Sequence, residues 1–267
     1  MTDNLPKKPK AFITDLNDFD KNEKSLHMSV SAKNLDRLKE LSIENLWLIG
    51  ANDKDLRKIL PLVNLKYLNL YQVLAKDLTI LETLDKTETI ILNWNTKSTS
   101  LWDISKNKGL KTLEITDFSK LEEIDQLSLA TQISNLTLGG GHDKPLKIKS
   151  INPLKNLTNL NTLSLTNLKI ADDTLQSLGH LKNLETLFLS NQFETREYAW
   201  LATRLPKTKC KMFQATNSCN IVGADNKLVW DTMVTGRKKS FLLSTKDQVK
   251  IEKYIKDFEK LKNELAE

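Results

Sequence analysis

The chain has 267 residues, of which 39% are apolar and 28% are charged, a balance typical of globular proteins and outside the range of disordered ones. Its 8 glycines and 6 prolines exclude collagen-like and low-complexity architectures. The 40 lysines and arginines exceed the 34 aspartates and glutamates by six, with both signs interspersed. This small excess falls short of the clustered basic footprint of a nucleic-acid-binding protein, so nucleic acid is an unfavoured partner.

Residues 1–41 are predicted to form an N-terminal cap for the repeats that follow. Leu26-x-Met28 has the apolar alternation of a strand, and we expect it to cap the sheet. A short helical face follows it, formed by Leu35, Leu38 and Leu41. No apolar run follows the first ten residues, as a secretory signal would require. No stretch approaches the ~18 apolar residues of a membrane span, so we expect a cytoplasmic protein without membrane contact.

A short motif then recurs along residues 42–215, with apolar residues at its first, fourth and sixth positions, although a weaker copy begins with Thr87. Its clearest copies include Leu65-x-x-Leu68-x-Leu70 and Leu184-x-x-Leu187-x-Leu189. The fourth position falls at residues 46, 68, 90, 113, 136, 163, 187 and 210, in steps of 22 to 27 residues. This period lies within the ~20–29 residues of a leucine-rich repeat. The sequence therefore predicts about eight stacked repeats, with a degenerate last strand at Cys210-x-Met212.

Each repeat is predicted to contribute one strand and one helical return segment. Alternate side chains of a strand face opposite sides, so Leu68 and Leu70 point inward while Tyr67, Asn69 and Tyr71 point outward. The return segments space their apolar residues by three, which favours helical or 3-10 turns. They include 78–84, 121–127 and 175–181. Because the strand side is narrower, the stack must curve with the sheet on its concave face.

Residues 151–189, which begin INPLKNLTNLNTLSLTNLKI, resemble the short repeats of bacterial leucine-rich-repeat proteins. Internalins and the regulatory subunits of protein phosphatase 1 have similar repeats, and the resemblance covers about residues 41–215. It implies an α/β solenoid with a curved parallel sheet on the concave face, helical or 3-10 turns on the convex face, and terminal caps. The resemblance is specific for the fold and weak for function.

One position departs from this resemblance. The family's repeats have an asparagine at the ninth motif position, which bonds the backbone where the chain leaves the sheet. Here only Asn95 fits, and the other repeats have Ala51, Val73, Phe118, Gly141, Leu168 and Gln192. Buried N–H groups are rarely left unpaired, so we expect irregular turns, especially after Leu138. Residues 139–141 are three glycines that lack the phosphate-loop pattern, and we expect them to serve a bulge.

Residues 216–267 are predicted to form a C-terminal cap. A strand is expected at 228–230, and a final amphipathic helix from about residue 245. The apolar stripe of this helix consists of Ile251, Ile255, Phe258, Leu261 and Leu265. Docking on the chain's own repeats is the favoured role of this stripe, and docking on a partner is the alternative.

Catalytic, metal and cofactor sites are not predicted. The three histidines, His27, His142 and His180, lie far in sequence from both cysteines, and no Cys or His pair has metal-ligand spacing. Cys210 and Cys219 either stay reduced or form one bridge, and the sequence leaves this open. We therefore expect a protein that is not an enzyme. A cysteine-dependent enzyme using Cys219 would need a base supplied by the fold.

The outward strand positions are the candidate binding site. The middle of the sheet is rich in threonine, serine and asparagine, whereas aromatic and aliphatic residues gather at its two ends. The predicted partner-binding residues are Trp47, Ile49, Tyr67, Asn69, Tyr71, Ile91, Asn93 and Trp94 near the first repeats, and Phe188 and Phe213 near the last. Exposed tryptophan and tyrosine are enriched at interface hot spots. We therefore expect a monomeric, non-catalytic module that binds a protein or peptide.

Two alternatives to this interpretation remain. In the first, threonine suits a parallel strand and the capping segment covers Trp47, so that the surface has only a structural role. In the second, Arg237, Lys238 and Lys239 of the C-terminal cap bind a nucleic acid or a phosphate ligand. Phosphate contacts would make the affinity of that complex fall steeply with salt.

Overall fold

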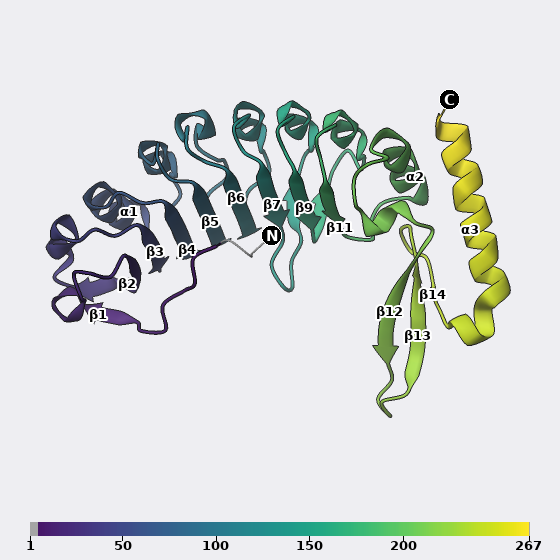
Figure 1. Ribbon diagram of the computed structural model, residues 1–267, viewed down its shortest axis with the longest axis horizontal. Coiled ribbons are helices and arrows are strands. Elements are labelled where there is room, and N and C mark those ends of the chain that lie inside the picture. The colour runs from purple at the N-terminus through teal and green to yellow at the C-terminus, as the bar shows by residue number, and fades with distance from the viewer. Residues whose placement is uncertain (1–4, 267) are drawn as a thin grey trace.

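The computed structural model describes residues 5–266, so residues 1–4 and 267 of the predicted caps lie outside it. The described residues build a curved nine-stranded parallel sheet in chain order (Figure 1). Its strands are β1 (Ile13–Asp15), β2 (Ser25–Lys33), β3 (Asn45–Ile49), β4 (Tyr67–Val73), β5 (Thr89–Asn95), β6 (Thr112–Phe118), β7 (Asn135–Gly139), β9 (Thr162–Thr166) and β11 (Thr186–Leu189).

Strand pairing follows the predicted period. Leu46 lies beside Leu68, Leu68 beside Ile90, and the row continues through the fourth motif position of every strand to β11. The expected strand at Leu26 is β2, and Leu26 lies beside Leu46 in the same row. Residues about two dozen positions apart in sequence therefore become immediate neighbours.

The return segments form the convex face, as expected. Most are 3-10 helices, including η4 (Thr79–Thr83), η5 (Ile104–Lys106), η6 (Asp125–Leu129), η7 (Asn152–Asn156) and η8 (Gln176–His180). Two are α-helices, α1 (Asp53–Ile59) and α2 (Thr195–Arg204). The three-residue apolar spacing buries one edge of each short helix; Leu81, Leu127 and Leu178 are fully buried. The predicted leucine-rich-repeat solenoid is confirmed.

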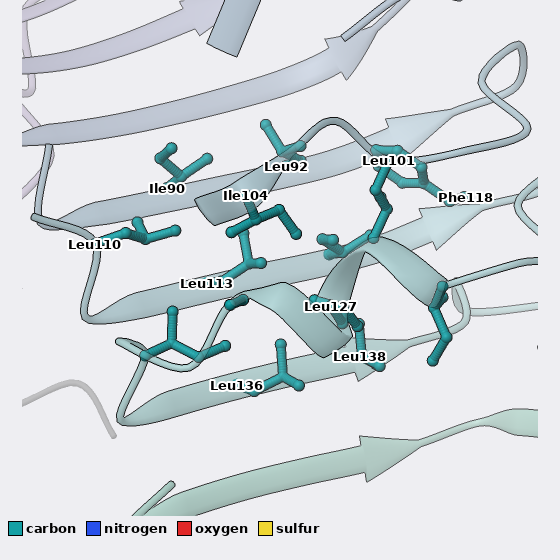
Figure 2. Close-up of a cluster of buried hydrophobic side chains, with 14 of the residues drawn as sticks. Ile90, Leu92, Leu101, Ile104, Leu110, Leu113, Phe118, Leu127, Leu136 and Leu138 are labelled. Atoms are coloured by element: carbon teal, nitrogen blue, oxygen red, sulfur yellow. The ribbon is translucent and has the colours of Figure 1, made fainter. Parts of the chain in front are cut away.

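The core is the space between the strands and these return segments. Figure 2 shows Leu113 of β6, Ile104 of η5 and Leu127 of η6 directed into the same layer. Their apolar contacts continue from repeat to repeat in one cluster that extends from Leu16 to Phe258. One repeat could not bury such a layer alone, so the stack is the stable unit.

The turns after the strands satisfy their backbone groups in different ways, as the missing asparagines predicted. The buried amide of Asn95 donates to Ala75 O at 2.8 Å and accepts from Lys97 and Ser98 N–H at 2.7 and 2.8 Å. After Leu138 the chain bulges, and a second small sheet pairs β8 (Leu146–Ile148) with β10 (Leu168–Ile170). Gly140 lies so close to neighbouring backbone that an added Cβ would be 2.4 Å from Lys144 O. These glycines have a packing role.

The prediction of a last strand at Cys210-x-Met212 is wrong. Lys209 makes an isolated parallel bridge to Thr186, but Lys211–Phe213 forms the 3-10 helix η9. The copy at Cys210-x-Met212 differs from the others because its first position, Lys207, is exposed, whereas Thr87, the other first-position residue that is not apolar, is buried. Met212 still enters the core.

The C-terminal segment packs on the last repeat. Strands β12 (Thr216–Val222), β13 (Leu228–Val234) and β14 (Phe241–Leu242) form an antiparallel sheet, and α3 (Ser244–Ala266) runs beside α2 (Figure 1). Phe258 of α3 is buried in the main core, so this helix docks on its own chain. Ser244 Oγ lies 2.5 Å from Asp231 Oδ2, which ties the helix start to β13. Within residues 5–266, no helix combines the length and apolarity needed to cross a bilayer.

Candidate interaction surface

The concave face is made by the outward side chains of the strands. The fifth motif position forms one continuous row of neighbours, running from β2 to β11: His27, Trp47, Asn69, Ile91, Glu114, Thr137, Ser164 and Phe188. The structure therefore brings the predicted residues of the first repeats together. Phe188 lies at the opposite end of the same row, beyond the polar middle.

Three of the predicted residues are not exposed. Trp47, Tyr67 and Ile91 are only 5%, 5% and 8% exposed, and they form a separate cluster on the concave face. The rings of Trp47 and Tyr67 have centroids 4.8 Å apart. Leu5 packs on this cluster and covers it. The expectation that these three side chains face solvent was wrong, because period alone cannot show that an N-terminal segment lies over them.

The covering segment, residues 5–12, is here called the N-terminal arm. Figure 1 shows it on the concave side of the sheet, where it returns to β1. Phe12 lies edge-on against His27, with ring centroids 4.8 Å apart. Neither ring nitrogen of the buried His27 makes a hydrogen bond of good geometry, although the Pro9 backbone lies near enough to favour the protonated ring and so raise its pKa slightly. Burial lowers the pKa of His27, and the positive charge of Lys8 lowers it further. His27 is therefore held neutral beneath the arm.

Two predicted aromatics are exposed and adjacent. Tyr71 and Trp94 are 46% and 40% exposed, and their rings meet edge to face with centroids 5.7 Å apart. Trp94 follows the outward Asn93 and has a left-handed backbone, with φ of 60°. The same position is left-handed in other repeats, at Gly50, Gln72, Asp117 and Asn167. A bulky residue is unusual in this conformation, where glycine and asparagine are favoured.

Polar groups surround this aromatic pair. Asn93 Nδ2 donates to Thr116 Oγ1 at 2.6 Å, and Asn69 Nδ2 donates to the hydroxyl of Tyr67 at 3.3 Å. Burial raises the pKa of Tyr67, so its hydroxyl stays protonated at neutral pH. Ile49 is half-buried beside Tyr71, its register neighbour on β4. Together with Tyr71 and Trp94, these side chains form an amphipathic surface that we call the aromatic rim: Ile49, Asn69, Tyr71, Asn93 and Trp94.

One residue of this face was missed by the sequence reasoning. Glu114 lies beside Ile91 in the fifth-position row and is half-buried. It is the only charged residue at the third, fifth and seventh motif positions of β3 to β11. Within residues 5–266 it makes no hydrogen bond or ion pair, and burial raises the pKa of its carboxyl. A single acidic residue in a row of neutral ones was the available signal.

The far end of the sheet holds a separate groove of about 1020 Å³. Phe188 and Phe213 both line it, together with Lys262 of α3. Phe188 is exposed, whereas Phe213 is half-buried in η9 and is not a sheet residue. The two predicted phenylalanines therefore share one groove, distant from the aromatic rim along the curve of the sheet.

The basic segment of the C-terminal cap is engaged in structural contacts. Arg237 Nε donates to Gln192 O at 2.8 Å, and the guanidinium also pairs with Asp173. The Lys239 ammonium lies 5.7 Å from the ring centre of Tyr254. The Arg237 contacts fasten the cap to the repeats and leave its guanidinium poorly placed to bind a phosphate, whereas the Lys239 contact lies within the cap.

The two cysteines are not bonded to each other. Burial raises the pKa of Cys210 to about 11, and burial and Asp231 raise the pKa of Cys219. A nucleophilic thiol needs the opposite shift, because the thiolate is the reactive form. Across residues 5–266, no three His, Cys, Asp or Glu side chains gather as metal ligands would.

Strand register, curvature and convex 3-10 turns define a leucine-rich-repeat solenoid with an aromatic concave rim. Among solved structures, the chain is similar to internalin C2 of Listeria monocytogenes, with 22% identity and a TM-score of 0.47 over 67% of this chain and 74% of that one. It is also similar to the internalin inlF of that organism, with 18% identity and a TM-score of 0.44 over 71% of this chain and 62% of that one. No protein-family model and no curated protein matches the chain.

Proposed function

We propose that the chain is a non-catalytic protein-interaction module that binds a protein or peptide through its concave face. It acts inside a bacterial cell as a monomer and without a cofactor. The aromatic rim is the centre of the contact. Phe188 and Phe213 provide a second contact for a partner long enough to follow the curve.

The observation that carries this proposal is the exposed pair of Tyr71 and Trp94. Large aromatic side chains held rigidly in a partly apolar setting are the residues that contribute most at protein interfaces. Trp94 keeps its position although its left-handed backbone costs ~1–2 kcal/mol in a non-glycine residue. The left-handed backbone itself belongs to the turn of the repeat, because four other repeats share it, so only the choice of tryptophan at this position calls for a functional reason. Folding alone would favour asparagine or glycine at this position.

The partner should depend on this pair. Tagged full-length chain is used to capture proteins from an extract of the cell that encodes it, and bound proteins are quantified by mass spectrometry. The Tyr71→Ala/Trp94→Ala double variant should reduce recovery of the specific partner at least ~10-fold, since truncating one hot-spot residue costs ~2 kcal/mol or more. The matched control is Leu129→Ala, which removes a 53% exposed apolar side chain from the convex helix η6.

Recovery should be unchanged by Leu129→Ala. Equal recovery with the wild-type chain and the double variant would remove the aromatic rim from the proposal. Circular dichroism of both variants checks that they fold, which we expect because the replaced side chains are exposed.

A further inference from the structure

The N-terminal arm occupies part of the proposed binding face. Leu5 packs on the cluster of Trp47, Tyr67 and Ile91, and Phe12 packs on His27. Lys7, Lys8 and Lys10 are exposed. The arm contacts this face through the side chains of Leu5 and Phe12 and through the approach of the Pro9 backbone to His27, much as a short peptide anchors by a few side chains.

Directly beside this covered cluster lies the carboxylate of Glu114. Glu114 is the register neighbour of Ile91, so it lies one strand spacing, ~4.8 Å, further along the sheet. Among residues 5–266 no cation pairs with it, although it is half-buried. A carboxylate that is partly removed from water without a partner is destabilising, and a bound cation would offset that cost.

The cluster covered by Leu5 and the nearby carboxylate of Glu114 together indicate which chemical groups a ligand of this face would have. We infer that the concave face between β3 and β6 takes an extended peptide that places an aliphatic side chain on Trp47, Tyr67 and Ile91, and a lysine or arginine against Glu114. The peptide replaces Leu5, which acts as an internal placeholder. This inference rests on the proposed function and specifies the chemistry of its partner.

The spacing of the two peptide groups follows from the geometry. An extended chain advances ~3.3–3.6 Å per residue. Ile91 of the apolar cluster and Glu114 lie on neighbouring strands, one strand spacing apart. The cation should therefore lie within about three residues of the aliphatic anchor. Because the arm is tethered to the sheet, it competes at a high effective concentration and lowers the apparent affinity of any peptide.

The first test identifies the ligand class without assuming a sequence. A phage-displayed library of random peptides is selected on the full chain and on its Leu5→Ala variant. We expect enriched peptides to pair an aliphatic residue with a lysine or arginine within about three positions. Enrichment of acidic peptides, or of peptides without this pair, would overturn the inference.

The second test isolates the charge. The best enriched peptide is synthesised with a fluorescent label, and its affinity is measured by anisotropy for the wild-type chain and Glu114→Gln. A version with glutamine in place of the cation is measured beside it. Glu114→Gln should lower the affinity for the cationic peptide ~10-fold and leave the affinity for the glutamine peptide unchanged. The control Asp117→Asn alters another carboxylate near the end of β6 and should change neither affinity.

The third test concerns the placeholder. Leu5→Ala should strengthen peptide binding at least ~3-fold, because the arm then covers the cluster of Trp47, Tyr67 and Ile91 less often. Val249→Ala, which alters an exposed side chain on α3, is the control and should have no effect. Unchanged affinity in Leu5→Ala, or equal loss of both peptides in Glu114→Gln, would overturn the inference.

The outcomes also separate this inference from the proposed function. Peptides that lose affinity in Tyr71→Ala/Trp94→Ala but not in Glu114→Gln would reject the inference and retain the concave interface. If no peptide is enriched on either version of the chain, the inference is rejected. The proposed function then depends on the capture experiment alone.

Discussion

The hydroxyl of Tyr198 on α2 accepts a hydrogen bond from the backbone N–H of Gln192 at 2.9 Å, in the turn that follows β11. It also accepts from Phe193 N–H at 3.0 Å and donates to Ser190 O at 2.5 Å. Burial raises the pKa of Tyr198 to about 12, so this donor keeps its proton. A side chain from the next helix thus satisfies the turn backbone after β11, as the Asn95 side chain does after β5.

Removing this hydroxyl should destabilise the last repeat. Tyr198→Phe leaves buried backbone donors without partners, and we expect a loss of ~2–3 kcal/mol in the free energy of unfolding. Urea denaturation followed by circular dichroism measures it. Tyr71→Phe removes an exposed hydroxyl and should change stability by less than ~0.5 kcal/mol. Similar stabilities for the two variants would contradict the role assigned to Tyr198.

Trp94→Asn should separate stability from binding. Asparagine tolerates the left-handed backbone, which relieves ~1 kcal/mol or more. Loss of the edge-to-face contact with Tyr71 costs ~0.5–1.5 kcal/mol. The two effects nearly cancel, so the urea midpoint should move little while partner recovery falls at least ~10-fold. A large loss of stability would show that Trp94 serves the fold.

Stability should fall on mild acidification because of His27. Its pKa in the folded chain is lowered from 6.5, so the unfolded chain binds the proton more readily. Stability is therefore complete above about pH 7 and is lost as the pH falls through 6.5 toward the folded pKa. His27→Leu should flatten this dependence in urea midpoints, and it should stabilise the chain at neutral pH by removing two unpaired buried nitrogens.

The control for this pH dependence is His142→Gln, which changes a histidine whose side chain is almost fully exposed. This variant should retain the wild-type dependence. If His142→Gln flattened the curve and His27→Leu did not, His27 would not be the group that responds.

Glu114→Gln should change the pH dependence of stability in the opposite direction. Burial raises the pKa of Glu114 above 4.5, so folding favours the uncharged carboxyl. This contribution to stability is present at low pH and is lost as the pH rises through the folded pKa. The glutamine variant should thus be more stable than the wild-type chain at neutral pH, and the difference should vanish below pH 4.5. A destabilised variant at neutral pH would reveal a partner for the carboxylate.

The repeat register was predictable because a parallel stack imposes one row per motif position. Spacing alone placed Leu68 beside Ile90 and Leu163 beside Leu187, and it assigned the outward residues to one face. The failure at residues 210–213 has a local cause, since the first position of that copy is the exposed Lys207. Period determined secondary structure where the first position is buried, which includes Thr87 before β5.

The candidate site was less predictable than the fold. The sequence correctly predicted that Trp47, Tyr67 and Ile91 point to the concave face. It wrongly predicted that they are exposed to solvent, because Leu5 packs over them. Coverage depends on where a distant segment of the chain lies, and no period records that. The sequence shows Glu114 as the single acidic residue among the outward positions of β3 to β11, but its partial burial and the absence of a partner among residues 5–266 came only from the structure.

By itself, the sequence determined the solenoid, its curvature and which side chains share the concave face, because a short repeating unit can bury its leucines only against copies of itself. Only the tertiary structure decided which of those side chains remain accessible. The reason is physical: stacking is a nearest-neighbour property encoded in each repeat. The position of the N-terminal arm is a single long-range packing event, made by Leu5 and Phe12 against residues that share no motif with them.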